Sequence, residues 1–269
     1  MKKLLFLFAI WFSLSLSAFG QNACEYFKKG LVKSELKDYS GAIKDFTQAI
    51  TIEPNNVTYY LRGIAKSDIK DYSGAIADYT QAITLNPNFA NAYYRRGGAK
   101  SDLKDYYGAI ADYTQAITLS PNDADAYFDR GYAKDDIKDY SGAIADFTQA
   151  ITLNSNYAEA YYNRGIAKND LNDHYSAIAD YTQAITLSPN YAEAYCNRGN
   201  AKYELKDYSG AIVDYTQAIT LNPNDADAYY NRGLAKAILN DIQGACLDWS
   251  KAGELGDTKA YDLIQKFCH

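Results

Sequence analysis

The side chains best suited to chemistry are four cysteines and two histidines, scattered along a chain of 269 residues. They form no cluster with the spacing of zinc ligands, so the sequence predicts no metal site. His174 stands alone, without the neighbouring ligand or base that a catalytic role would need, and we interpret it as a packed or surface substitution. The glycines form no phosphate-binding motif, and we expect no cofactor.

Adjacent carboxylates are the other candidates, because two carboxyl groups with different pKa values can act as an acid–base couple. Asp135 and Asp136 are such a pair. They fall on a segment expected to be an exposed helix, with nothing apolar around them to separate their pKa values, so we predict that both are solvated. Asp123 and Asp225 stand where helices should begin and are interpreted as caps. The sequence therefore predicts no catalytic residue and no enzymatic activity.

The residues above belong to a repeating framework marked by an Arg-Gly pair that returns every 34 residues. The pairs begin at Arg62, Arg96, Arg130, Arg164, Arg198 and Arg232. Lys29-Gly30 opens the series one residue short. The seven repeats that result are 23–55, 56–89, 90–123, 124–157, 158–191, 192–225 and 226–259. A fixed period of this size is typical of stacked supersecondary elements rather than of one closed globule.

Each repeat is predicted to contain two antiparallel helices. In the third repeat, residues 90–103 are good helix formers, Lys104-Asp105 is a break, and a second run follows. That run has one apolar helical face, made of Ala109, Ile110, Tyr113, Ala116 and Ile117. Pro121 then ends the second helix. One helix pair cannot bury such a face alone, so neighbouring repeats must stack on each other.

The repeat resembles the tetratricopeptide repeat (TPR), and the match recurs from residue 23 to residue 259. The residues at the signature positions of the third repeat are Tyr93, Gly97, Ala109, Tyr113, Ala116 and Pro121. The resemblance implies an all-α fold, a right-handed superhelical α-solenoid of stacked helix-turn-helix repeats.

Two departures from the TPR pattern recur. Where the family has leucine before the glycine and an aromatic residue three positions after it, this chain has Arg96 and Lys100. Every second helix offers an aspartate in register: Asp45, Asp78, Asp112, Asp146, Asp180, Asp214 and Asp248. We therefore predict an internal series of Arg–Asp pairs, called here the Arg–Asp ladder, with lysine stems on apolar surface and their ammonium groups in water. The alternative is an ordinary solvated charge pattern.

Residues 1–20 lie outside the repeats and have the pattern of a secretory signal peptide. Lys2 and Lys3 precede an apolar run, and Ala18-Phe19-Gly20 supplies small residues for cleavage before Gln21. An uncleaved anchor is the alternative, but the run is short for a membrane span. Cleavage would change the formal net charge from −6 to −8. We expect a periplasmic or extracellular protein that does not insert in a membrane and, being acidic, does not bind nucleic acid.

An exported chain meets oxidising conditions, in which cysteines can pair. Cys246 and Cys268 are the candidate disulfide, because it would tie the last repeat to a C-terminal capping helix expected within residues 257–269. Cys24 and Cys196 belong to distant repeats and should not reach each other.

In TPR proteins the first helices line the concave surface, and the resemblance carries a partner-binding role to inward positions of this chain. The predicted residues are Tyr60, Tyr94, Arg95, Asp125, Phe128, Asp129, Tyr132, Asp136, Glu159, Tyr162, Asn163, Asp170, Asn197, Tyr203, Tyr230 and Asn231. Rings with polar tips and asparagine amides suit an extended peptide, and the carboxylates favour a neutral or basic one. The alternative is that the tyrosines only pack between repeats and the charges only maintain solubility.

These observations lead to two hypotheses from different classes. The first is an exported scaffold that binds a protein or peptide in an acidic, tyrosine-lined groove. The second is a structural spacer or self-associating module of the cell envelope with no specific ligand. TPR proteins that hold acidic peptide C-termini use lysines and asparagines, which only Arg95 and scattered asparagines resemble here, so that specificity is not carried over.

Overall fold

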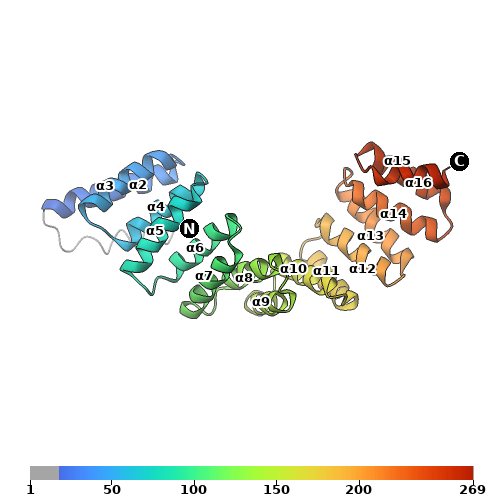
Figure 1. Cartoon of the computed structure of the whole chain (residues 1–269), viewed down its shortest axis with the longest axis horizontal. Helices are drawn as coiled ribbons and strands as arrows, with labels where there is room; N and C mark the ends of the chain where they lie inside the picture. Colours follow the sequence, from blue (N-terminus) through green and yellow to red (C-terminus); the bar gives the residue numbers. More distant parts are fainter. Residues whose placement is uncertain (1–17, 269) are drawn as a thin grey trace. The chain divides into compact units, whose positions relative to one another are not determined.

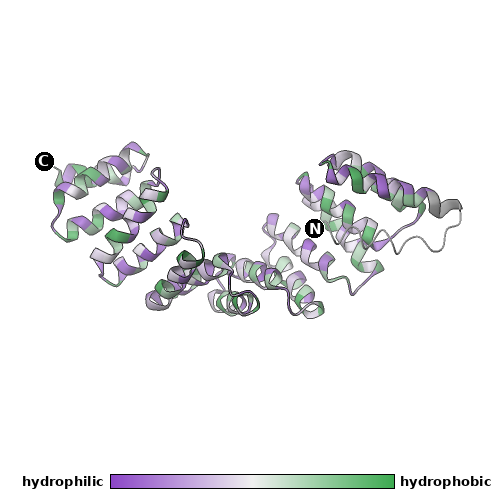
Figure 2. Cartoon of the chain, turned by 180° about the vertical axis from the view of Figure 1, so that it is seen from behind, coloured by the Kyte–Doolittle hydropathy of each residue, from purple (hydrophilic) through white to green (hydrophobic). Residues whose placement is uncertain are grey.

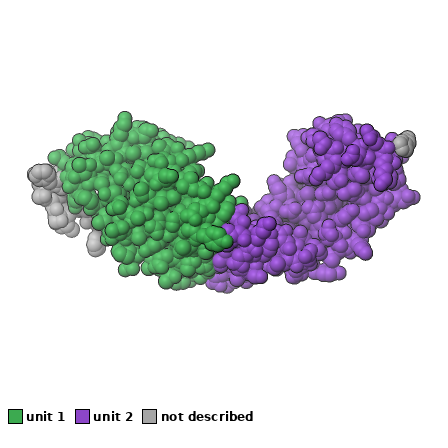
Figure 3. Space-filling model, in the orientation of Figure 1, with its two compact units in different colours: residues 1–133 green, residues 134–269 purple. Residues whose placement is uncertain are grey.

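The computed structural model describes residues 18–268, which contain helices and turns and no strand. Residues 1–17, most of the predicted signal peptide, lie outside this range. The chain divides into two compact units, residues 1–133 and 134–269 (Figure 3). Each unit is a series of antiparallel helix pairs (Figure 1). The predicted all-α fold of stacked helix-turn-helix repeats is confirmed.

Unit 1 begins with three complete helix pairs, in which each helix contacts the next along the chain. Their bounds are α2 (Ala18–Glu35), α3 (Tyr39–Ile52), α4 (Asn56–Asp68), α5 (Tyr72–Leu85), α6 (Ala90–Asp102) and α7 (Tyr106–Leu119). Helix α8 (Ala124–Asp136) follows, and the division between the units falls near its end.

Unit 2 continues the same alternation and ends with one extra helix that contacts α15. Its bounds are α9 (Tyr140–Leu153), α10 (Ala158–Asp170), α11 (His174–Leu187), α12 (Ala192–Glu204), α13 (Tyr208–Leu221), α14 (Ala226–Ile238), α15 (Ile242–Glu254) and α16 (Lys259–Phe267).

A three-residue turn joins the two helices of each repeat. In repeat three, Lys104 takes the left-handed conformation (φ 62°), which ends α6. The Asp105 carboxylate then accepts a hydrogen bond of 3.0 Å from the Gly108 amide and caps α7. Because a left-handed residue and an aspartate recur at these two positions, every repeat makes the same reversal.

The core of each repeat consists of an aromatic ring of the second helix packed on a glycine of the first. Tyr113 is buried, and a Cβ at Gly97 would lie only 2.9 Å from its ring. Ala133, on the first helix of the following repeat, joins the same cluster. Hydrophilic and hydrophobic residues are interspersed along the helices (Figure 2), which lets one side of each enter such a core. The small residue at position 97 therefore lets the two helices of the repeat approach each other closely.

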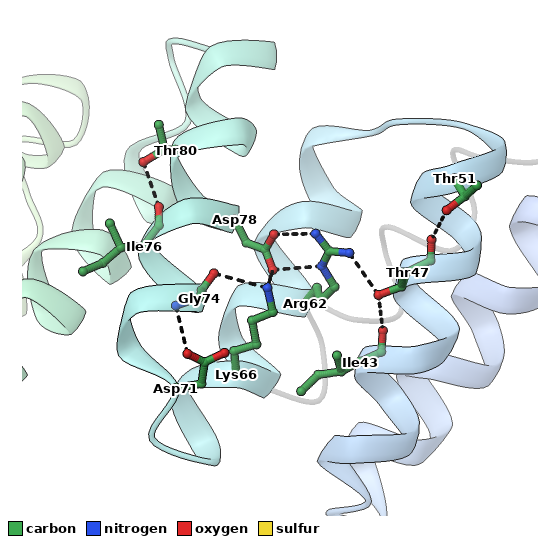
Figure 4. A network of polar contacts seen from close by, with 10 residues as sticks. All are labelled: Ile43, Thr47, Thr51, Arg62, Lys66, Asp71, Gly74, Ile76, Asp78 and Thr80. Atoms are coloured by element: carbon green, nitrogen blue, oxygen red, sulfur yellow. Dashed lines mark hydrogen bonds and ion pairs between the residues drawn. The ribbon is translucent and has the colours of Figure 1, made fainter.

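The Arg–Asp ladder is present. Arg62 on α4 donates two hydrogen bonds to Asp78 on α5, of 2.6 and 2.9 Å (Figure 4). Equivalent bidentate pairs join Arg96–Asp112, Arg164–Asp180, Arg198–Asp214 and Arg232–Asp248. The remaining guanidinium nitrogen of Arg62 donates to the Thr47 hydroxyl of the preceding repeat at 2.9 Å, so one side chain links two repeats. This threonine recurs at one position of the repeat, but its contact with the arginine was not predicted from the sequence.

The prediction that the lysine ammonium groups remain in water is wrong. Lys66 Nζ lies 2.8 Å from the Asp78 carboxylate, and its side chain is only 19% exposed. The lysine follows the arginine by one helical turn, so both cations reach the same carboxylate. In repeat one, where Lys29 replaces the arginine, Lys33 pairs with Asp45 and Lys29 pairs with Glu25 on its own helix.

The last repeat is closed by α16. Cys246 on α15 and Cys268 form a disulfide, and closing a loop of this length stabilises a fold by about 3 kcal/mol in the chain-entropy estimate. Trp249 is buried beneath α16 together with Ala260, and its indole N–H donates to the Tyr230 carbonyl at 3.3 Å. Among the described residues, no helix combines the length and the apolar character needed to span a membrane.

Candidate partner-binding surface

All of the predicted partner-binding residues lie on the first helices of their repeats. In unit 1 they are on α4, α6 and α8, and in unit 2 on the end of α8 and on α10, α12 and α14. Since the repeats are in register, residues 34 apart occupy equivalent places on successive first helices.

Unit 1 contains a pocket of about 190 Å³ that brings together Tyr94, Arg95 and Asp129. The other lining residues are Ile64, Ser67, Asp68, Tyr79, Gly98, Ala99 and Asp102. Tyr94 Oη donates a 2.7 Å hydrogen bond to Asp129 Oδ2, which joins α6 to α8. The Arg95 guanidinium lies 5.8 Å from the centre of the Tyr94 ring. Desolvation by burial raises the pKa of Asp129 and, together with the Asp129 charge, that of Tyr94.

The other predicted residues of unit 1 do not line this pocket. Tyr60 packs between Tyr79 and Phe89, with ring centres 5.9 and 4.9 Å away. Asp125 and Tyr132 are exposed, and Phe128 is half-buried.

In unit 2 a chain of amide and hydroxyl groups runs across the first helices. Asn197 Nδ2 on α12 donates to the Tyr162 hydroxyl on α10 at 2.9 Å. Asn200 Oδ1 accepts from Tyr215 Oη at 2.8 Å and from Asn231 Nδ2 on α14 at 3.2 Å. The two central asparagines contact each other at 3.4 Å. Three successive repeats therefore share one polar strip, made of Tyr162, Asn197, Asn200 and Asn231. Asn200 was not among the predicted partner-binding residues.

The predicted tyrosines of unit 2 also pack, as the alternative hypothesis held. Tyr162 lies 5.9 Å from Tyr181 and 4.7 Å from Tyr191, measured between ring centres. Tyr203 meets Tyr208 edge-on at 5.2 Å. Tyr162, Tyr203 and Tyr230 are nevertheless half-buried rather than fully enclosed. The rings therefore support the stack while part of each surface stays accessible.

The carboxylates of unit 2 are less uniform than predicted. Glu159, Asp136 and Asp170 are exposed, whereas Asp135 is half-buried and its Oδ1 has no hydrogen-bond partner. Burial and the nearby charges of Asp170 and Asp136 raise the pKa of Asp135 to about 6. The prediction that Asp135 and Asp136 are both solvated is wrong, because Asp135 is half-buried.

A tyrosine-to-phenylalanine difference accompanies the unpaired oxygen of Asp135. In repeat two the equivalent residue, Ser67, lies 3.3 Å from the Tyr79 hydroxyl. Repeat four has Phe147 at the tyrosine position, so no hydroxyl is available there. This combination could be found in the sequence by comparing repeats.

We expect Asp135 to make stability depend on pH. Its raised pKa means that the folded state favours the protonated form, so its contribution is present below about pH 4, the unfolded pKa, and is lost by about pH 6. A pKa shift of this size corresponds to about 3 kcal/mol, and solvent screening of the half-buried carboxyl group reduces the expected loss to about 1 kcal/mol. Urea unfolding at pH 4 and pH 7 would measure the effect. At pH 7 the free energy of unfolding of Asp135→Ser should exceed that of the wild type by this amount. Phe147→Tyr, which supplies a donor, should recover part of it.

Glu53→Gln is the control for this pH effect, because Glu53 is an exposed carboxylate that is not among the groups that raise the pKa of Asp135. It should not change the difference in unfolding free energy between the two pH values. A pH-independent effect of Asp135→Ser would contradict the assignment.

In the described part of the chain, the remaining side chains that could take part in chemistry are two cysteines and one histidine. Cys196 is buried, and burial raises its pKa to about 12, so its thiol stays protonated at neutral pH. Cys24 is the other unpaired cysteine. His174 Nδ1 lies 2.8 Å from Asn169 Oδ1. Within residues 18–268 no group of histidines, cysteines and carboxylates is arranged to hold a metal ion.

Family models match most of this framework. A TPR repeat model matches residues 68–104, 100–135, 136–172, 167–206 and 199–237, and a tetratricopeptide repeat model matches residues 26–56. The chain belongs to the tetratricopeptide repeat family. A search of curated proteins returned no match.

Solved TPR structures resemble this TPR chain over much of its length. MamA is 27% identical, with a TM-score of 0.60, and the match covers 64% of this chain and 93% of MamA. YrrB, described as a TPR protein with an unusual peptide-binding site, is 22% identical over 68% of this chain and 95% of its own, with a TM-score of 0.62. The C-terminal part of a TPR repeat-containing protein from Cytophaga hutchinsonii is 18% identical, with a TM-score of 0.76, and covers 88% of this chain and 99% of its own.

Proposed function

We propose that this TPR chain is an exported, non-enzymatic scaffold whose first helices bind an extended peptide segment of a partner protein. The polar strip of unit 2 carries the proposal. Its amides and hydroxyls join α10, α12 and α14, and groups of this kind can hydrogen-bond a peptide backbone. The peptide-binding site of YrrB is consistent with this use of the fold.

The proposal includes a preference for neutral or basic segments. The exposed carboxylates Glu159, Asp136 and Asp170 lie on the same first helices as the polar strip or on the neighbouring α8. Opposite charge at a binding surface speeds association and excludes partners of the same charge. Export is supported by the signal-peptide pattern of residues 1–20 and by the Cys246–Cys268 disulfide, since such bonds persist in oxidising compartments.

The test is selection of short random peptides by residues 21–269. We expect capture of peptides rich in lysine or arginine, and Asp136→Lys with Asp170→Lys should weaken their binding about tenfold. Glu53→Lys with Glu254→Lys makes the same change in net charge away from the first helices, and it should leave affinity unchanged. Failure to capture any peptide would overturn the proposal in favour of a spacer.

A further inference from the structure

The pocket of unit 1 borders a position at which one repeat lacks a side chain that the others have. Gly98 on α6 stands where repeats two and five carry Ile64 and Ile166. A Cβ at Gly98 would meet only the Tyr113 hydroxyl, at an ordinary 3.8 Å. The glycine is therefore not required by close packing, unlike Gly97 beside it, whose Cβ would strike the Tyr113 ring. Its effect is to leave open space between the repeats.

The size of this space limits what can enter it. Pockets that hold whole small molecules have volumes of about 300–1,000 Å³, whereas this one has about 190 Å³. It is also open rather than sealed, since Asp68 and Asp102 of its lining are exposed. A single protruding side chain fits these dimensions better than a free cofactor or metabolite.

The residues that line the pocket indicate which kind of side chain would fit it. Three carboxylates face one guanidinium, and that guanidinium, of Arg95, is already placed beside the Tyr94 ring. Asp129 is held in position by the Tyr94 hydroxyl. Ile64 and Ala99 supply apolar wall. An apolar wall with carboxylates matches a lysine or arginine, which has an aliphatic stem and a cationic end.

We infer that the Gly98 pocket binds one basic side chain of the partner segment and so sets one position of its sequence. This inference rests on the proposed function, because the side chain must arrive on a bound peptide. It adds a specificity pocket within unit 1 to the polar strip of unit 2.

Two variants distinguish the effect of the open space in the pocket from the effect of its negative charge. Gly98→Ile fills the pocket with the residue that repeats two and five carry at this position. Asp129→Asn removes the charge and keeps the hydrogen bond to Tyr94. An asparagine already occupies the equivalent position of repeat six, where Asn197 donates a 2.9 Å hydrogen bond to Tyr162. Both should unfold within a few degrees of the wild type. Leu234→Ile, at the same position of repeat seven, is the control for Gly98→Ile.

The probes are peptides selected by the wild type, each with one lysine exchanged for norleucine, which keeps the stem and lacks the charge. We expect the wild type to favour lysine about tenfold at one position. Gly98→Ile should reduce affinity for the lysine peptide about tenfold, whereas Asp129→Asn should reduce the lysine preference and leave norleucine binding intact. Leu234→Ile should change neither.

The outcomes separate this inference from the proposed function. Peptides that bind without a lysine preference, or whose preference survives both variants, overturn the pocket assignment alone. A preference for glutamate would also overturn it, because Arg95 would then be the recognising group. If no peptide binds, both proposals fail.

Discussion

Gly97→Leu should destabilise the protein by about 3 kcal/mol, the upper part of the range for overpacked cores. A Cβ at this position already lies 2.9 Å from two ring carbons of Tyr113, which is buried and cannot move without displacing Ala109 and Ala133 of its cluster. The clash is therefore with a packed ring rather than with a flexible chain end. Thermal and urea unfolding followed by circular dichroism would measure the loss.

The adjacent glycine provides the control. Gly98→Leu makes the same change one residue later on the same helix, where repeat seven carries Leu234. We expect an effect within about 1 kcal/mol, because the new side chain enters open space and leucine favours the helix. Equal losses for the two variants would show that the helix pair tolerates no side chain here, and would contradict the distinction between packing and pocket glycines.

The features that could be predicted from the sequence are those that recur from repeat to repeat. Gly97 and its counterparts, the helix pairs and the Arg–Asp ladder recur with one period, so repeated copies of each constraint reveal it. The Cys246–Cys268 bond was predicted from a different argument, the need to tie a last helix to the stack, and the structure contains it.

The features that escaped prediction depend on distances between helices. Lys66 reaches Asp78 because α4 and α5 lie close together, which its sequence position alone does not state. Asp135 has a raised pKa because burial and the nearby charges of Asp170 and Asp136 disfavour its ionised form. No pocket was predicted at Gly98, and the placement of Tyr94 and Asp129 shows that it borders one. Comparing equivalent positions across repeats, rather than matching each to a family pattern, would have flagged the last two.

The predicted partner-binding residues show the same difference between features that recur along the sequence and contacts that depend on distances in the fold. The family resemblance placed them all on first helices, as observed. It could not show that Tyr94 would bind Asp129 or that Tyr162 would bind Asn197 in the next repeat. Groups that also hold the stack together can be altered only with loss of stability, so tests of binding should use the exposed carboxylates and Gly98 instead.

Asp180→Leu should cost about 3–5 kcal/mol, the largest effect expected of any substitution considered, because it strands buried cations. Asp180 accepts hydrogen bonds of 2.6 and 2.8 Å from Arg164 and one of 2.7 Å from Lys168. The arginine and the aspartate are 15% and 6% exposed, so little water can replace the lost partner. Arg164 also donates to Thr148 of the preceding repeat at 3.1 Å, and its displacement would loosen that junction too.

A double-mutant cycle distinguishes a true pair from two independent losses. Arg164→Leu with Asp180→Leu removes both members, and a coupling of about 1–3 kcal/mol is expected between them. The exposed pair Lys251–Glu254, at 3.1 Å, is the control and should show about 0–1 kcal/mol that falls at high salt. The coupling of the buried pair should persist at high salt, because ions screen buried charges poorly. Additive effects in the cycle would mean that the recurring arginines and aspartates stabilise the stack separately, through Thr148 and Lys168, and that their bidentate contact contributes nothing of its own.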